Sequence, residues 1–395
     1  MLNTLKSFDL KGKRILIRVD FNVPLKDGLV VDNFRVKAAL PTIQHCLSSG
    51  ASVVLMSHLG RPNGVVVEDL SLIPVGETLA DLLEQSIKFS HDCISEDARD
   101  VSLGLSSGEV HLLENLRFHK EESENNAAFS ALLAKHGSIY INDAFGTAHR
   151  AHASNVGVAN YFSQRGIGYL VEKEVQFLSE VIKGPKRPLV VILGGAKVGS
   201  KLRLINRFLE EADKIIIGGG MAFTFLQAMG KNIGRSLVDQ SMLGSATNII
   251  NAAKSRKTEL IFPTDVICST GLDKPEVSAE FGVDEIPGDQ MGLDIGKNSI
   301  QLFQSVIAKA ATIIWNGPMG VFETPGFENG TRLIAEAIAA VTDEGTTSVV
   351  GGGDSAAAVK KYNIMDKMSH VSTGGGASLE LLSGVVLPAL NVLER

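Results

Sequence analysis

Polar and cationic side chains follow each apolar run in the first half of the chain, at the point where the run ends. In an open sheet of parallel strands, ligands bind beyond the carboxyl ends of the strands. Guanidinium groups match phosphate and carboxylate oxygens in pairs, so clustered arginines at this edge predict an anion pocket. The residues just beyond the runs are Asp20, Phe21 and Asn22; His58, Leu59, Gly60 and Arg61; Arg117; and Arg150.

Taken singly, each of these residues can also be interpreted without an anion pocket. A single arginine after a strand is usually a solvated surface charge, but clustered cations repel one another without a ligand. His58, His149 and His152 have a weaker claim, because histidines in such loops often only bond to the backbone. A carboxylate beside an anion pocket repels the anion, so Asp20 is expected to orient an arginine or to accept a substrate hydroxyl.

Glycine takes the place of arginine in the second half of the chain. The loops GGAKVGSK, GGGMAF, WNGPMGVFE and GGGDSAAA each follow an apolar run. Glycine lets the backbone approach a phosphate, although close packing also selects it. Two lysines, Lys197 and Lys201, favour the phosphates of a nucleotide. The first loop is not a Walker A loop, because Ser200 precedes Lys201 where the order should be reversed.

Asp354 begins a predicted helix directly after three glycines. It could serve only as a helix N-cap. The sharper hypothesis makes it the metal-site residue, an acidic group facing the Mg²⁺ that accompanies the nucleotide.

Short runs rich in Val and Ile alternate with segments of helical period, a pattern typical of doubly wound α/β domains. The expected strands are 14–19, 51–56, 109–113 and 138–142, then 188–193, 213–218, 259–263, 311–316 and 347–352. Between the two halves, the stretch YLVEKEVQFLSEVIKGPKRP is expected to form a connecting helix that ends at Gly184 and Pro185.

Composition excludes several classes of protein. The chain has 395 residues, 44% of them hydrophobic and 21% charged, and a net charge of −6, which disfavours a nucleic-acid or membrane partner. Three widely separated cysteines suggest neither disulfides nor a zinc site. The N-terminus lacks a signal-peptide pattern, and no stretch is long and apolar enough for a membrane span. We therefore expect a cytoplasmic protein.

The motifs resemble a known family. RVDFNVP, SHLGRP, NLRFH, DAFGTAHRAHAS, GGAKV with a second lysine four positions on, WNGPMGVFE, GGGDS and STGGGASLE are similar to the signature segments of phosphoglycerate kinase, and they occur in its order. The chain departs from the family in AKVGSK, where a polar pair would be expected before the second lysine, and in Ser355, where threonine is commoner. Both departures keep the lysines and a hydroxyl.

The resemblance implies reversible phosphoryl transfer between 1,3-bisphosphoglycerate and MgADP, giving 3-phosphoglycerate and MgATP, a step of glycolysis and gluconeogenesis. It assigns the 3-phosphate to His58, Arg61, Arg117 and Arg150, beside Leu59 and Gly60, and the hydroxy-acid portion to Asp20 and Asn22, beside Phe21. It assigns the nucleotide to Lys197, Lys201, Glu323, Gly352, Gly353, Asp354 and Ser355, with Gly292 as a less certain neighbour of the base.

Both possible nucleophiles, a β-phosphate and a carboxylate, are ionised near pH 7, so the reaction needs no general base. The remaining work is alignment and charge neutralisation. Arg35 and Lys197 are the catalytic candidates, and Arg35 also contacts substrate in this hypothesis. Without the resemblance, Arg35 would be interpreted as an exposed helix residue.

Two other classes remain. A nicotinamide dehydrogenase shares this type of fold, but DFNVP stands where G-x-G-x-x-G should follow the first strand. A nucleotide sensor would not need the arginine loops.

The hypothesis divides the chain into parts and predicts motion. A phosphoglycerate-binding domain spans 1–170, an interdomain helix and hinge 171–185, a nucleotide-binding domain 186–380, and a returning segment 381–395. Two Rossmann-like domains whose sheets face each other across a hinged cleft would close only with both ligands bound. We expect a monomer that binds small-molecule substrates.

Overall fold

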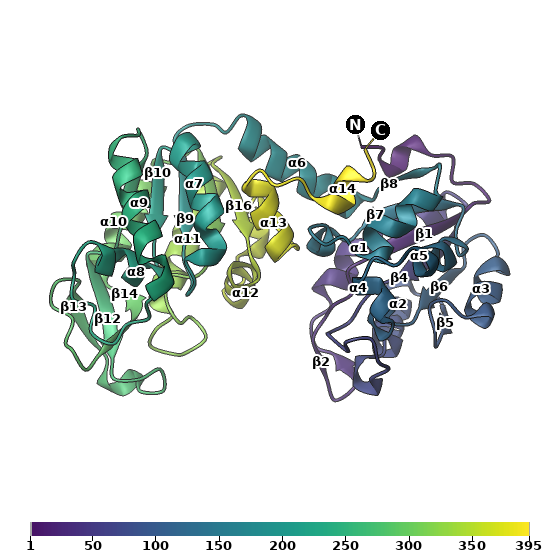
Figure 1. Cartoon of the computed structure of the whole chain (residues 1–395), viewed down its shortest axis with the longest axis horizontal. Helices are drawn as coiled ribbons and strands as arrows, with labels where there is room; N and C mark the ends of the chain where they lie inside the picture. Colours follow the sequence, from purple (N-terminus) through teal and green to yellow (C-terminus); the bar gives the residue numbers. More distant parts are fainter. Residues whose placement is uncertain (1, 395) are drawn as a thin grey trace. The chain divides into compact units, whose positions relative to one another are not determined.

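The computed structural model describes residues 2–394, and they form two compact units (Figure 1). Unit 1 runs to Gln176 and also includes the chain from Val386 onward, and unit 2 is the continuous segment Phe177–Val385.

Unit 1 is built on a six-stranded parallel sheet in the order β5-β6-β4-β1-β7-β8. Strand β1 lies inside the sheet, between β4 and β7. The strands are β1 (Arg14–Val19), β4 (Ser52–Met56), β5 (Lys88–Ser90), β6 (Val110–Leu113), β7 (Ile139–Asp143) and β8 (Arg165–Ile167), and a small hairpin joins β2 (Leu25–Lys26) to β3 (Leu29–Val30).

Side-chain alternation separates the two faces of this sheet. Ile15 and Ile17 of β1 pack in a core that includes residues of helices α1 (Phe34–Ser48) and α2 (Ile73–Leu83). On the other face, His111 of β6 meets Ser102 of helix α3 (Glu96–Leu103). Helices α4 (Lys120–Ser123) and α5 (Ala127–Ala134) lie between β6 and β7 in the sequence.

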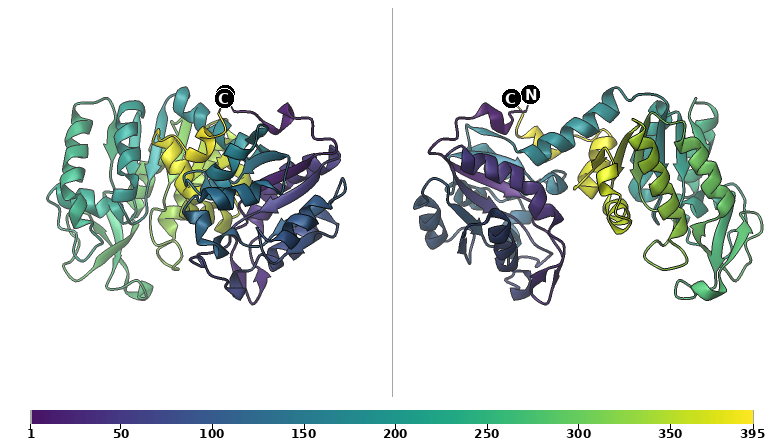
Figure 2. Two further views of the ribbon diagram at one scale, coloured as in Figure 1. Left: turned by 45° about the vertical axis from the view of Figure 1, so that its right-hand side comes forward. Right: turned by 180° about the vertical axis from the view of Figure 1, so that it is seen from behind.

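Unit 2 repeats this plan with the strand order β11-β10-β9-β15-β16-β17, again all parallel. One face packs on α10, α11 and α12 through a core centred on Trp315 and Phe303, and other helices cover the opposite face (Figure 2). The strands are β9 (Leu189–Leu193), β10 (Lys214–Ile217), β11 (Glu259–Ile261), β15 (Thr312–Asn316), β16 (Thr347–Gly351) and β17 (His370–Val371), and the helices are α7 (Leu202–Glu211), α8 (Met221–Ala228), α9 (Leu243–Lys254), α10 (Lys297–Ile307), α11 (Asn329–Asp343), α12 (Gly353–Lys361) and α13 (Gly375–Leu382).

The two parallel sheets confirm the predicted α/β class, and the structure adds strands that the sequence patterns did not indicate. Unit 2 carries a separate antiparallel sheet formed by β12 (Asp265–Ser269), β13 (Ala279–Gly282) and β14 (Met291–Ile295). Its strand order is β13-β12-β14. The short strands β5, β8 and β17 extend the edges of the parallel sheets. Gly292 therefore lies in a strand, β14.

The expected connecting helix is α6 (Tyr169–Lys183), and the division between the units falls inside it, after Gln176. At the other end of the chain, α14 (Pro388–Asn391) belongs to unit 1, where Ala389 N donates a hydrogen bond to Ala148 O at 3.1 Å. A bridge between Leu2 and Glu394 brings the two ends of the described chain together. The predicted substrate and nucleotide roles of the domains stay predictions.

Among the helices of residues 2–394, none combines the length and the apolar character that crossing a bilayer requires.

Candidate functional site

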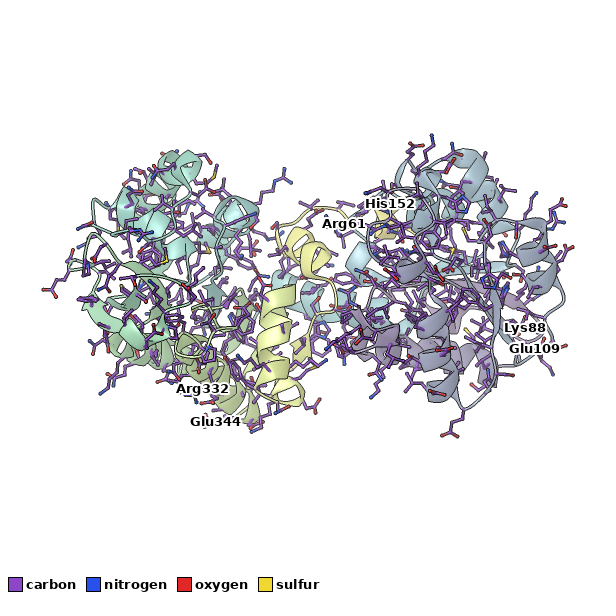
Figure 3. The ribbon with its side chains drawn as sticks, turned by 90° about the horizontal axis from the view of Figure 1, so that it is seen from below. Arg61, Lys88, Glu109, His152, Arg332 and Glu344 are labelled. Carbon is purple, nitrogen blue, oxygen red and sulfur yellow. The ribbon has the colours of Figure 1, made fainter. Side chains whose placement is uncertain are left out.

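The three loop arginines of unit 1 share one cavity of about 290 Å³. Arg61 comes from the loop after β4, Arg117 from the turn after β6, and Arg150 from the loop after β7. Asn63, Gly64, Ser123 and His152 complete the lining, and Figure 3 labels Arg61 and His152. The parallel sheet thus gathers residues that are almost ninety positions apart in the sequence, as the position of the loops predicts.

Asn115 holds the Arg117 turn against the loop that follows β4. Its side-chain oxygen accepts hydrogen bonds from Leu59 N and Arg117 N, both at 3.1 Å, and its amide donates to Leu59 O at 2.7 Å. Arg117 Nη1 donates to Gly60 O at 2.6 Å. Gly60 has φ +61, a left-handed conformation that suits glycine. Leu59 and Gly60 do not line the cavity themselves, but their backbone groups hold Asn115 and Arg117 in place.

The charge around the cavity is positive. Burial, with Arg150 and Arg18 nearby, lowers the pKa of Arg117 to about 10, which leaves it charged at neutral pH. Burial and the nearby cations Arg117, Arg18 and Arg150 lower the pKa of His152 to about 4. His152 is therefore neutral, and its 3.8 Å approach to Glu122 is not an ion pair. An anion is the ligand that this lining favours.

A second group of unit 1 residues surrounds Asp20 at the end of β1. Asp20 Oδ2 accepts a hydrogen bond from Arg35 Nη1 at 2.9 Å, and Asn22 O accepts from the same nitrogen at 3.3 Å. The Asn22 side chain accepts from Gly60 N at 2.9 Å. Phe21 is fully buried, and its N–H donates to Ser57 Oγ. Arg35, near the start of α1, is thus held beside the β1 loop while about a third of its side chain stays exposed.

His58 lies beside this group, with its Nδ1 3.8 Å from Asp20 Oδ1, and it also contacts Arg18, a residue that the sequence motifs did not indicate. Arg18 is buried inside β1, where its Nη2 lies 3.2 Å from His58 Nδ1 and its Nε donates to Ser154 Oγ at 2.7 Å. Burial and the cations Arg18, Arg117, Arg150 and Arg35 lower the pKa of His58 well below its usual range. His58 is therefore neutral, and its Nδ1 accepts from Arg18. The available signal was a charge inside the apolar run RILIRV.

Unit 2 contains a cavity of about 390 Å³ walled by the glycine loops after β9, β10 and β15 and by the antiparallel sheet. Three of the predicted nucleotide residues line it, Gly292, Glu323 and Asp354. The lining also includes Arg235 and Asp294, which the sequence patterns did not indicate.

Several of the glycines allow loops to pack against one another. A Cβ on Gly194 would lie 2.1 Å from Pro318 O, one on Gly219 would lie 2.5 Å from Gly195 N, and one on Gly317 would lie 2.3 Å from Gly194 O. These contacts leave no room for any side chain. The glycine pattern therefore reflects close backbone packing at these positions.

The two lysines of the first glycine loop differ in their surroundings. Lys197 is exposed, whereas Lys201 is buried near Gly195. Burial lowers the pKa of Lys201, and the nearby Asp354 acts in the opposite direction. Lys201 can therefore bind a phosphate group, and the neighbouring carboxylate of Asp354 can bind a cation that accompanies the phosphate.

The segment Gly352–Ser355 forms the beginning of α12. Gly352 has φ +93 and precedes the helix, and Gly353 is its first residue. Ser355 Oγ is buried and accepts a hydrogen bond from Gly317 N at 2.6 Å, which ties the helix to the loop after β15. The amide groups of a helix start are suited to phosphate. Asp354 is exposed there and offers a hard oxygen ligand.

Asp294 forms a buried support behind the cavity. It accepts hydrogen bonds from Gly330 N at 2.7 Å and Ile295 N at 2.9 Å. Burial raises its pKa to about 7. The hydrogen bond between Asp294 and Gly330 ties β14 to the beginning of α11.

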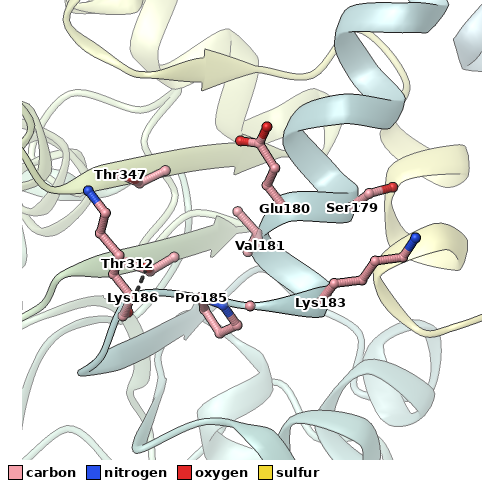
Figure 4. A pocket seen from close by; sticks show the side chains of 9 residues that line it. Ser179, Glu180, Val181, Lys183, Pro185, Lys186, Thr312 and Thr347 are labelled. Atoms are coloured by element: carbon pink, nitrogen blue, oxygen red, sulfur yellow. Dashed lines mark hydrogen bonds between the residues drawn. The ribbon is translucent and has the colours of Figure 1, made fainter.

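Another pocket of about 470 Å³ lies at the opposite end of the unit 2 sheet, where β15 and β16 begin (Figure 4). It is lined by the end of α6 and the following segment, and Thr312 Oγ1 donates to Lys186 O at 2.8 Å. None of the predicted site residues lines it.

Comparisons with known proteins agree with this arrangement. The family model described as phosphoglycerate kinase matches residues 5–385. Phosphoglycerate kinases of Gloeothece citriformis and Nostoc sp. are 49% and 50% identical to this chain, over 98% and 99% of it and over 97% and 98% of their own lengths. The solved structure of phosphoglycerate kinase from Coxiella burnetii covers 100% of this chain and 99% of its own with a TM-score of 0.89 at 38% identity. That from Pyrococcus horikoshii OT3 covers 100% and 98% with a TM-score of 0.87 at 34% identity. The chain belongs to the phosphoglycerate kinase family.

Proposed function

We propose that this chain catalyses reversible phosphoryl transfer between 1,3-bisphosphoglycerate and ADP, giving 3-phosphoglycerate and ATP. It is then an ATP:3-phosphoglycerate phosphotransferase of glycolysis and gluconeogenesis. The observation that carries the proposal is the pairing, in one member of this family, of an arginine-lined cavity in unit 1 with a glycine-walled cavity in unit 2. A sensor that bound only a nucleotide would have no use for the first cavity.

In unit 1, Arg61, Arg117 and Arg150 would bind the 3-phosphate through paired N–H donors. His58 is neutral and buried, so it would contribute a hydrogen bond but no charge. Asp20 and Asn22 would contact the hydroxy-acid portion. In the same hypothesis, Asp20 also orients Arg35 through their 2.9 Å bond.

In unit 2, the start of α12 would bind nucleotide phosphates through Gly352, Gly353 and Ser355. Lys201 would add a positive charge beneath the same phosphates. Glu323 and Gly292 line the cavity where the rest of the nucleotide would lie.

The exposed carboxylate of Asp354 fits a nucleotide-bound Mg²⁺, which proteins usually hold by one or two carboxylates together with phosphate oxygens. When bound, the ion would offset the negative charge of the phosphates.

The chemical step needs charge and alignment from this chain, since both nucleophiles are already ionised near neutral pH. Arg35 and Lys197 would neutralise charge on the equatorial oxygens of the transferring group. Arg35 is held in place by Asp20, whereas Lys197 is exposed and would have to be ordered by the phosphates. Localisation in the cytoplasm and a monomeric state stay predictions; the three free cysteines fit a reducing compartment.

A coupled assay of the full chain with 3-phosphoglycerate and MgATP tests the proposal. We expect turnover, and we expect Arg61→Ala to raise the KM for 3-phosphoglycerate at least about tenfold, because one charge-assisted pair is lost. The KM for ATP should stay unchanged. Arg99→Ala, which removes a partly exposed arginine of unit 1 outside the cavity, is the charge-matched control.

Absence of turnover in the folded protein would refute the function. An unchanged KM for 3-phosphoglycerate in Arg61→Ala would refute only the assignment of the anion cavity.

A further inference from the structure

Three potential metal ligands from two separate segments meet in unit 1 outside the arginine-lined cavity. Asp92 and Cys93 lie in the loop between β5 and α3, and His119 lies between the turn after β6 and helix α4. Their ligand atoms are all within 4.8 Å of one another, and no other such group occurs in residues 2–394. None of the three lines the anion cavity.

The spacing of these atoms suits a small tetrahedral ion. Bonds of about 2.0–2.3 Å to nitrogen, oxygen and sulfur place neighbouring ligand atoms roughly 3.3–3.7 Å apart. His119 Nε2 and Asp92 Oδ2 are already 3.2 Å apart. The Cys93 sulfur, within 4.8 Å of both, would need to move by only about 1 Å or less to complete a face of the tetrahedron.

The Asp92 carboxylate is already oriented for this role. Its Oδ1 accepts hydrogen bonds from Ile94 N at 2.6 Å and Ser95 N at 2.8 Å. Outer hydrogen bonds of this kind fix the direction of a metal ligand. Oδ2 is left facing His119, and about 39% of the Asp92 side chain is exposed, so an ion can enter from that side.

Cys93 is the buried member of the group. Its exposed fraction is only 1%. Burial raises the pKa of the Cys93 thiol, and the nearby carboxylates of Asp92, Glu122 and Glu114 contribute to the rise. The same negative surroundings would stabilise a cation next to the sulfur.

We propose that Asp92, Cys93 and His119 form a binding site for a thiophilic divalent cation of the Zn²⁺ class, with water as the fourth ligand. Binding would replace the hydrogen bond between His119 Nε2 and Asp92 Oδ2 by two bonds to the ion. The imidazole would then carry its proton on Nδ1 instead of Nε2, and the thiol proton would be released to solvent. Thiolate and imidazole are ligands that select such cations, whereas Mg²⁺ prefers oxygen. In the alternative, the hydrogen bond simply joins the two segments and no ion binds.

Titration of the full chain with Co²⁺ as the probe tests the site. A thiolate ligand produces a sulfur-to-cobalt charge-transfer band, so we expect this band at one ion per chain and its displacement by Zn²⁺. Cys93→Ser should abolish the band. His119→Gln should weaken Co²⁺ binding at least about tenfold, because loss of an outer-shell partner alone usually costs that much.

Matched controls come from the same chain. Cys46→Ser and Cys268→Ser remove the other two buried cysteines, and His91→Gln removes an exposed histidine one position before Asp92. All three should keep the band. A wild-type protein without the band, or a band that persists in Cys93→Ser, would overturn the proposal.

Thermal unfolding provides a second measurement that does not depend on the cysteine variant folding well. A site that binds only the folded chain raises Tm as ligand is added. Zn²⁺ should therefore raise the Tm of wild type more than that of Asp92→Asn or His119→Gln, and equal shifts in all three proteins would contradict the site. Neither readout uses enzymatic activity, so the outcome is independent of the proposed phosphoryl transfer.

Discussion

The pairing of Arg35 with Asp20 changes how this arginine should be interpreted. The 2.9 Å bond fixes the direction of the guanidinium group before any ligand arrives, which is the property that charge stabilisation in a transition state requires. An exposed helix arginine with no such partner would lose its order when the substrate left.

From this geometry we predict that Arg35→Ala lowers kcat at least about 100-fold, because removal of one preorganised charge costs about 3 kcal/mol at the transition state. We expect a loss of similar size in Lys197→Ala, because the phosphates would order this exposed lysine once they are bound. Steady-state kinetics in the coupled assay measures the effect. Lys37→Ala, which removes an exposed cation two positions along α1, should keep wild-type turnover. Near wild-type kcat in either test variant would remove that residue from the catalytic role.

A buried histidine pair in unit 1 predicts a pH dependence of stability. His111 lies 2.8 Å from Ser90 Oγ and 2.9 Å from Ser102 Oγ, and His136 lies 2.7 Å from the same Ser102 hydroxyl. Burial lowers the pKa of both histidines to about 4. Because an unfolded histidine takes up its proton near pH 6.5, the unfolded chain binds more protons between these values.

Stability from this pair should therefore be complete above about pH 6.5 and should fall as the pH drops toward 4, by up to about 3 kcal/mol for each histidine. The measurement is Tm between pH 7 and pH 4.5. His136→Gln should make this dependence shallower, even if it lowers Tm at pH 7. His91→Gln removes an exposed histidine and should leave the slope as in wild type; an unchanged slope in His136→Gln would show that His136 does not titrate as argued.

At the scale of elements, two neighbouring glycines at the start of α12 differ in whether the fold requires a glycine. Gly352 has φ +93, and a Cβ there would lie 2.7 Å from Asn316 Nδ2. Gly353, the next residue, has nothing within 4 Å of its ideal Cβ position. One glycine is thus required by the fold, and the other is free to be selected by a ligand.

We predict that Gly352→Ala destabilises unit 2 by about 1–2 kcal/mol or more, through backbone strain and the contact with Asn316. Gly353→Ala should leave Tm unchanged or slightly raised, since alanine favours a helix. If phosphate approaches the α12 backbone, Gly353→Ala should nevertheless raise the KM for ATP. Unchanged Tm and KM values in Gly353→Ala would exclude close approach of phosphate at that position.

The long central strands could be predicted from the sequence because burial on both faces makes them continuous apolar runs. The shorter strands lack this signal. β13 reads AEFG, with two exposed residues, and β17 has only two residues, so neither forms a run. The antiparallel sheet depends on packing with α8 through Phe223 and Leu226, a tertiary contact that no local pattern encodes.

The candidate site shows the same division. Arg61, Arg117 and Arg150 follow predicted strands and could be found by position alone. Arg18 and Asp294 lie within strands and act through buried hydrogen bonds, so their roles depend on residues far away in the sequence, Ser154 and Gly330.

For the whole molecule, we propose that the reaction requires the two units to move. The candidate acceptor residues belong to unit 1 and the candidate nucleotide residues to unit 2. Direct transfer requires reacting atoms within about 3–3.5 Å and exclusion of water, while both substrates must also enter and leave. Helix α6, which contains the division between the units, and the segment around Val385 would absorb the motion.

Solution scattering can measure this motion. The radius of gyration should fall more with MgADP and 3-phosphoglycerate together than with either ligand alone, because each ligand contacts mainly one unit. Saturation by each ligand alone is the control. An active enzyme whose radius of gyration is the same without ligand, with either ligand alone and with both ligands would refute closure.

The return of the chain to unit 1 also bears on how the protein is made. Unit 2 is one continuous segment, so all of its residues have been synthesised once Val385 has left the ribosome. Unit 1 begins earlier but is finished later, since α14 and Glu394, the partner of Leu2, are translated after all of unit 2. Unit 1 therefore remains incomplete while the whole of unit 2 is synthesised, and a premature stop just after Val385 would damage the unit whose synthesis began first.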